Sequence, residues 1–283
     1  MRSVSTARPR PLGASVDRTG VALVAALIAL AGLGWMITDE RMAGMDAGPG
    51  SDPGALGFFL TVWVVGMAAM MFPSVWPMVA VYARLQARRR EFARPAAAAR
   101  TVMFVGGYLL AWTGFGLLGW AAYQAAPVAG DALTWDRAGR WLTGGVVLVA
   151  AVYELTPAKY ACLRRCRSPL SFLLGAWRDG AAGALRMGVE HGAWCVGCCW
   201  ALMAALFVIG VMSVAWMAFV AALIATEKLL PWRRAAVATV TALLVALALG
   251  VAFAPERVPG LTVPSGADGP MMDHGSTGEP ETR

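Results

Sequence analysis

Charged side chains are scarce in this chain of 283 residues, because Asp, Glu, Lys and Arg together make up only 14% of it. Hydrophobic residues make up 58%, and the mean hydropathy is +0.60. A soluble globule could not bury this much apolar surface in one core. The composition therefore excludes a soluble protein and predicts one that uses the lipid bilayer as its solvent.

Histidine is nearly absent, with His191 and His274 as its two occurrences. With so few imidazoles most acid–base enzymes are hard to build, and we find no phosphate-binding loop, dinucleotide glycine fingerprint or hydrolytic triad. We therefore expect a binding protein rather than an enzyme. The net charge of +7 does not indicate a nucleic-acid partner, because the basic residues lie in short clusters between apolar runs.

Seven apolar runs approach the roughly 20 residues that a helix needs to cross a bilayer. They span residues 19–38, 57–82, 101–124, 140–156, 188–211, 213–229 and 234–254. We predict an all-α, polytopic transmembrane helical bundle of about seven helices over residues 19–254. A basic cytoplasmic tail (1–18) precedes it, and a periplasmic tail (255–283), rich in Gly and Pro and therefore disordered, follows it.

The basic residues predict the orientation of the bundle. With the N-terminus inside, 19 of the 24 Lys and Arg residues fall on inner segments. Such an excess in short loops is typical of the cytoplasmic side of a membrane. We expect a multi-pass protein of a bacterial inner (cytoplasmic) membrane, with the N-terminus inside and the C-terminus outside.

Three of the five cysteines lie within the run Glu190-His191-Gly-Ala-Trp-Cys195-Val-Gly-Cys198-Cys199. On a helix, His191, Cys195 and Cys198 share one face, and Cys199 is one step around it. Imidazole and thiolate are ligands for zinc or copper(I), and Glu190 is a further candidate ligand or an acceptor for the imidazole.

The other two cysteines, Cys162 and Cys166, lie in the preceding inner segment with a spacing of four, which places them on one side if the segment is helical. Neighbouring Arg164, Arg165 and Arg167 favour thiolates. Both cysteine groups fall on the same face of the membrane, where they could meet. The alternative is that each Cys serves as a small apolar residue of a membrane helix.

Methionines give a weaker signal. Met67, Met71 and Met78 follow helical spacing along one stripe of the second predicted helix, and thioethers bind copper(I) reversibly. They form a candidate relay across the membrane, although Met is also a common core filler. Met42 and Met45 follow the first helix, and Met271, Met272 and His274 lie in the tail, where they could capture copper on the outer side.

Several of these motifs resemble a bacterial family of predicted metal-binding integral membrane proteins, a domain of unknown function. They are Met70-Met71-Phe-Pro-Ser, Tyr153-Glu-Leu-Thr-Pro followed by Cys162 and Cys166, the run from His191 to Trp200, and Glu227-Lys-Leu-Leu-Pro. The resemblance covers residues 57–231. It implies a polytopic inner-membrane protein with a bound metal, held by Cys162, Cys166, His191, Cys195, Cys198 and Cys199.

Our main hypothesis is a protein that binds a soft metal, copper(I) before zinc, for transport or for delivery to a metalloenzyme. The expected partners are the lipid bilayer, the metal ion, and a copper chaperone or a copper enzyme under assembly. Two alternatives use the same cysteines: a membrane thiol–disulfide oxidoreductase, and a structural membrane subunit whose inner loop is stabilised by zinc.

Overall fold

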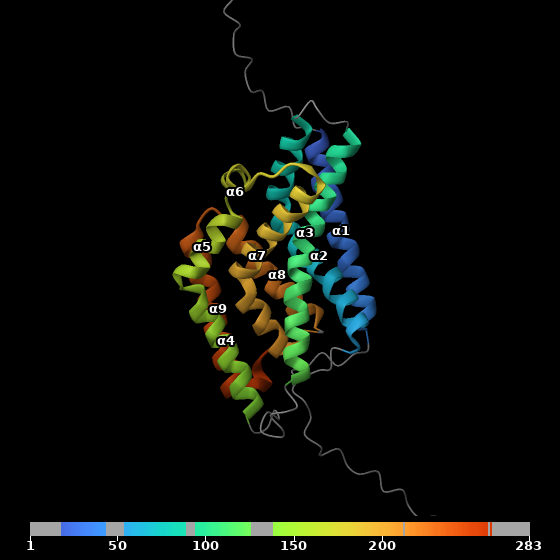
Figure 1. The fold of residues 1–283 in the computed structure, drawn as a ribbon. Helices are drawn as coiled ribbons and strands as arrows, with labels where there is room; N and C mark the ends of the chain where they lie inside the picture. The colour runs from blue at the N-terminus through green and yellow to red at the C-terminus, as the bar shows by residue number, and fades with distance from the viewer. Residues whose placement is uncertain are drawn as a thin grey trace, which may run out of the picture.

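The computed structural model describes residues 18–43, 54–88, 94–125, 138–211, 213–259 and 261. Within these residues the chain is all-helical, as predicted (Figure 1). Its elements are α1 (Arg18–Met42), α2 (Leu56–Arg88), α3 (Arg94–Ala125), α4 (Arg140–Glu154), α5 (Pro157–Cys166), α6 (Pro169–Ala176), α7 (Gly180–Gly210), α8 (Val214–Leu229), α9 (Arg233–Phe253) and the short 3₁₀ helix η3 (Pro255–Arg257).

Each of the seven predicted segments is helical, but not all are long enough to cross a membrane alone. Five helices have the required length and hydropathy, namely α1, α2, α3, α7 and α9. A sixth span arises if α4 and α5, which meet at an angle of 69°, count as one broken span. Helix α8 has 16 residues, fewer than a straight span of about 20 requires.

The segment between the fourth and fifth predicted helices is not a simple loop, because it contains α5 and α6. Pro157 occupies the first turn of α5, where a missing N–H costs nothing, and the Thr156 side chain caps that turn by accepting from the Lys159 N–H. Pro169 likewise occupies the first turn of α6, where no side chain caps the helix. The two prolines therefore break the chain into short helices that can turn back onto the bundle.

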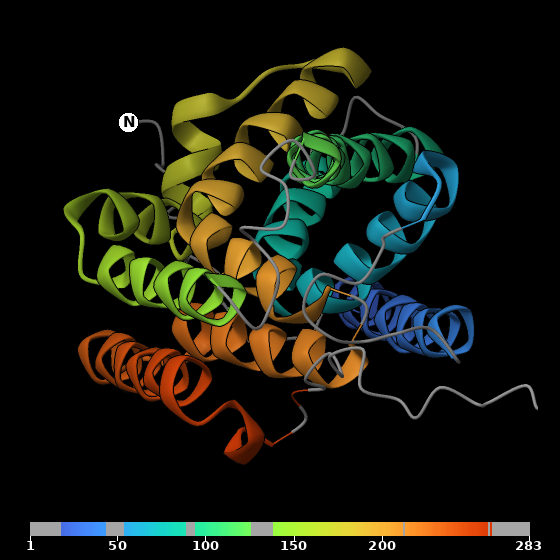
Figure 2. The same ribbon diagram turned by 90° about the horizontal axis from the view of Figure 1, so that it is seen from below.

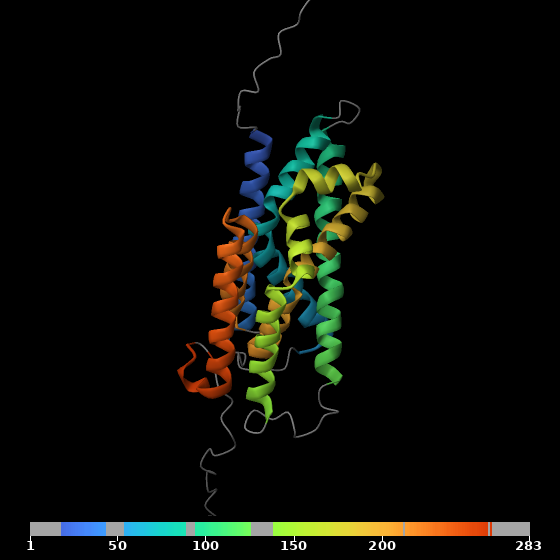
Figure 3. The same ribbon diagram turned by 90° about the vertical axis from the view of Figure 1, so that its left-hand side faces the viewer.

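Helix α7 occupies the interior of the bundle and packs against α3, α4, α5 and α8 (Figures 1 and 2). Helix α1 packs on α2, and α9 packs on α4, so these two helices lie on the outside. Figure 3 shows α4 and α5 following each other along the bundle, with α9 beside α4. The thiol-rich helix α7 is thus enclosed by its neighbours.

Close approach of α3 and α7 depends on glycines, which let helix backbones pack closely in a membrane bundle. A Cβ added at Gly192 would lie 2.7 Å from the Ala111 Cβ, and one at Gly188 would overlap the Phe104 carbonyl. On α3, Gly107 faces the α7 backbone equally closely, whereas Gly106 has open space around it.

Large apolar side chains also cover the outside of the bundle. Leu118 is 71% exposed, and Leu174 and Phe253 are each 69% exposed. An aqueous solvent would make this surface costly, whereas hydrocarbon would not. The length and hydropathy of the helices and the apolar outer surface of the bundle are therefore all compatible with membrane insertion. The first 17 residues and residues 262–283, which carry most of the two predicted tails, lie outside the described residues.

Candidate metal centre

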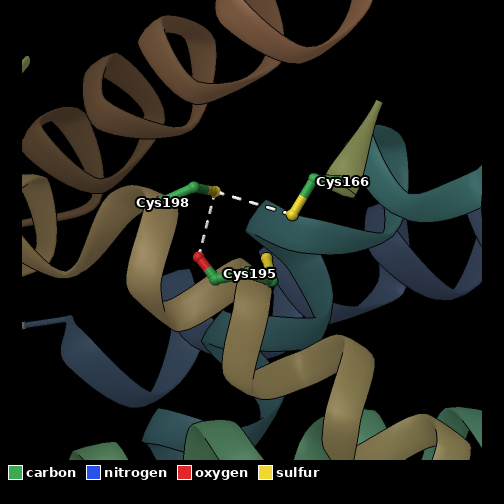
Figure 4. Close-up of side chains that lie close together, drawn as sticks. All are labelled: Cys166, Cys195 and Cys198. Atoms are coloured by element: carbon green, nitrogen blue, oxygen red, sulfur yellow. Dashed lines mark hydrogen bonds between the residues drawn. The ribbon is translucent and has the colours of Figure 1, made fainter. Parts of the chain in front are cut away.

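Three cysteines from two helices converge where α5 packs on α7. The sulfur atoms of Cys166, Cys195 and Cys198 all lie within 4.8 Å of one another, and those of Cys166 and Cys198 are 3.8 Å apart (Figure 4). Cys195 and Cys198 are each 1% exposed, and Cys166 is half-buried. We refer to Cys166, Cys195 and Cys198 as the three-thiol cluster.

The spacing of the cluster suits a metal–thiolate centre. With a metal–sulfur distance of about 2.3 Å, the value for zinc, the sulfurs of a trigonal site lie about 4.0 Å apart and those of a tetrahedral site about 3.8 Å apart. The separation of 3.8 Å between Cys166 and Cys198 matches both geometries. A soft ion would need only small side-chain movements to bind all three sulfurs.

Local sequence explains why these cysteines meet. Cys195 and Cys198 are three residues apart on α7 and therefore share one face. Cys166 is the last residue of α5, which packs on α7 after the sharp bend from α4. Gly197 permits this packing, because a Cβ there would lie 2.9 Å from the Cys162 sulfur.

A lysine supplies positive charge to the cluster. The Lys228 ammonium group on α8 lies 2.9 Å from the Cys195 sulfur and 3.5 Å from the Ser74 hydroxyl of α2. The Tyr108 hydroxyl of α3 is 3.0 Å from the same sulfur. An ammonium group at this distance would stabilise the negative charge that sulfur acquires as a metal ligand.

Comparison with protein-family models shows the family to which this chain belongs. The family model for PpoB2, described as a copper chaperone, matches residues 60–251. The chain belongs to the PpoB2 copper chaperone family. No curated protein and no solved structure matches it. The matched region contains the whole three-thiol cluster, which is compatible with metal binding. The sequence motifs resembled a family of predicted metal-binding membrane proteins, and the match shows a copper-related family.

Two other predicted cysteine ligands of this copper chaperone family member lie beside the cluster. The Cys199 thiol donates to the Cys195 carbonyl oxygen at 2.9 Å. The Cys162 sulfur packs on Gly197, and its residue is half-buried. Neither sulfur belongs to the group of described ligand atoms that lie within 4.8 Å of one another.

The predicted ligand His191 lies in an aromatic pocket next to the cluster. Its ring centroid is 5.2 Å from Phe172, 5.9 Å from Tyr108 and 6.2 Å from Phe104. It is 2% exposed, and its Nδ1 atom has no hydrogen-bond partner among the described residues. Its neighbour Glu190 is directed elsewhere, with its carboxylate 3.1 Å from Arg178 and 3.3 Å from Arg186.

The predicted methionine stripe is buried. Met67 and Met78 are each 1% exposed and Met71 is fully buried, all on α2. The stripe is connected to the cluster through Ser74, whose hydroxyl donates to the Met71 carbonyl and lies near Lys228. The structure thus places the thioethers in the interior of the bundle.

Sequence reasoning missed the contacts of Lys228 and Tyr108 with Cys195. Glu227 is 2% exposed, and Lys228 is half-buried against sulfur. The available signal was the presence of charges at the end of an apolar helix, where an unpaired charge is costly and usually has a partner.

Proposed function

We propose that this chain is a multi-pass protein of a bacterial inner membrane that binds copper(I) and delivers it to a copper enzyme under assembly. The observation that carries the proposal is the convergence of the Cys166, Cys195 and Cys198 sulfurs within 4.8 Å. Membership of a copper chaperone family supports the choice of copper as cargo.

The number of thiols favours copper(I) over zinc. Structural zinc is almost always held by four protein ligands in a tetrahedron, whereas the cluster within the described residues offers three. Thiolates are soft ligands that favour copper(I). A structural zinc site would require a fourth ligand such as His191, whose ring stacks on Tyr108 and lies against Phe172.

The position of Cys166 suits transfer of the ion. It is half-buried at the C-terminal end of a short helix, whereas Cys195 and Cys198 are held in the long helix α7. A partner's thiol could replace Cys166 before it replaces the other two ligands. The buried Met67, Met71 and Met78 would provide weaker, reversible ligands on the way across the membrane.

The first experiment measures the metal content of detergent-purified protein under reducing conditions. We expect close to one copper ion per chain in the wild type and loss of copper in Cys166→Ser, Cys195→Ser and Cys198→Ser. Cys199→Ser and Cys162→Ser test the boundaries of the cluster and should retain copper. Equal copper in all five variants, or bound zinc instead of copper, would refute the proposal.

One distance favours the second candidate function, thiol–disulfide exchange. The Cys166 and Cys198 sulfurs, 3.8 Å apart, could release two electrons and two protons to a partner disulfide and form a bond of their own. In that case the purified protein would lack metal, its thiols would be oxidised, and a Cys198→Ser variant would trap a mixed disulfide through Cys166.

A further inference from the structure

A second buried polar cluster lies next to the thiols and has no part in the function proposed so far. The Lys159 ammonium group of α5 is 2.6 Å from the Glu154 carboxylate at the end of α4 and 2.7 Å from the Glu227 carboxylate of α8. Lys159 is 1% exposed, and each glutamate is 2% exposed. We refer to Glu154, Lys159 and Glu227 as the acidic triad, because two carboxylates share one ammonium group.

The acidic triad has an acceptor oxygen that can bind a proton. Glu227 Oε1 is buried and has no hydrogen-bond partner among the described residues, whereas Glu154 Oε2 lies 2.6 Å from the Lys159 ammonium group. Both carboxylates contact the same Lys159 ammonium group, so the two side chains are neighbours, and the triad carries one excess negative charge when both are ionised. A proton on one carboxyl group would remove this excess charge and would satisfy the unpaired Glu227 oxygen, which is otherwise costly to bury.

Both carboxyl groups are next in sequence to a side chain that reaches the thiol-bearing part of α7. Tyr153, which precedes Glu154, donates its hydroxyl to the Gly197 carbonyl at 2.5 Å, next to Cys198. Lys228, which follows Glu227, is 2.9 Å from the Cys195 sulfur. The acidic triad and the three-thiol cluster are therefore in electrostatic contact within one buried region.

The other charged and titratable groups around the carboxyl pair come from every packed element. They are Tyr153 on α4, Cys162 on α5, Arg167 just after α5, Cys198 on α7, Lys228 on α8 and Arg233 at the start of α9. Arg167 is bound to the backbone carbonyls of Glu227 and Leu230, and Arg233 stacks on Tyr160. Lys159 is thus the cation in direct contact with both carboxylates among the described residues.

Copper loading changes the charge of this region. Each thiol that becomes a ligand loses its proton: the S–H electron pair forms the S–Cu bond, and copper stays monovalent. If all three thiols start protonated, the single positive charge of copper(I) replaces the charges of three protons, and the net charge of the region falls by two. If Cys195 starts as a thiolate, the net charge falls by one. In both cases an uncompensated negative charge arises in a buried site, which a low dielectric strongly disfavours.

We propose that the Glu154–Glu227 pair accepts a proton displaced from the thiols, so that the acidic triad is a proton-binding site linked to copper(I) loading. The proton leaves sulfur and forms an O–H bond on one carboxylate, which then donates to the other. The region keeps its charge nearly constant when copper arrives, and the same proton returns to sulfur when copper leaves. This inference rests on the proposed copper-binding function.

An infrared difference experiment on the wild-type protein tests the proposal without any variant. We expect copper(I) loading to produce the carbonyl band of a buried protonated carboxyl group. Glu154→Gln and Glu227→Gln should each remove or shift this band. Glu256→Gln, which alters an exposed carboxylate on η3, should leave it unchanged.

Proton counting gives an independent readout. In weakly buffered detergent solution, the Glu154→Gln/Glu227→Gln double variant should release about one more proton per bound copper than the wild type. Stoichiometric copper binding with no carboxyl band in the wild type, or with equal proton release in both proteins, overturns the inference and leaves the proposed function intact. Absence of bound copper overturns both, and the metal assay identifies that case by itself.

Discussion

Removal of the Lys228 charge should weaken copper(I) binding while leaving the three thiols in place. Lys228→Met keeps an unbranched side chain of similar length but removes an ammonium group that lies 2.9 Å from the Cys195 sulfur. A hydrogen bond to a charged group contributes about 1.5–3 kcal/mol, and each 1.4 kcal/mol is a factor of ten in affinity. We therefore expect the copper(I) dissociation constant to rise by about 10- to 150-fold.

The assay is a competition for copper(I) between the purified protein and a chromophoric chelator, without oxygen and with a reductant present. Arg234→Gln is the matched control, because it removes one positive charge from an exposed position at the start of α9. Its affinity should equal that of the wild type. Helicity and elution volume of both variants should confirm that the bundle is intact.

One result would refute the reasoning. If Lys228→Met binds copper(I) as tightly as Arg234→Gln does, then the ammonium group does not compensate the charge on the thiolates. The 2.9 Å contact would then be a packing feature of α8, and the charge argument for the cluster would fail.

Three further predictions test the bundle around the site. Lys159→Met should lower the free energy of unfolding in detergent by about 3–5 kcal/mol, because it leaves two buried carboxylates without their cation, and denaturant titration measures the loss. Gly188→Ala should cost about 1–3 kcal/mol through overpacking against the Phe104 carbonyl, whereas Gly106→Ala, which meets open space, should cost nothing measurable. Topology reporters fused after residue 90 should be active on the cytoplasmic side and those fused after residue 130 on the outer side, as the distribution of basic residues predicts; the reverse pattern would refute the orientation.

The sequence alone predicted the helices because each long apolar run has to satisfy its backbone hydrogen bonds internally if it is to sit in hydrocarbon. It also placed Cys195 and Cys198 on one helical face, which follows from helix geometry and needs no partner.

Which of the six predicted Cys and His ligands meet was decided by the tertiary structure. A helix that is apolar on all sides does not reveal which face it turns inward, so Cys199 and His191 were indistinguishable in sequence from the residues that join the cluster. Cys166 reaches α7 because of the 69° bend between α4 and α5. The contact of Lys228 with Cys195 and the contact of Lys159 with both glutamates join residues of different helices. Such contacts depend on how separate helices pack, and no local pattern encodes them.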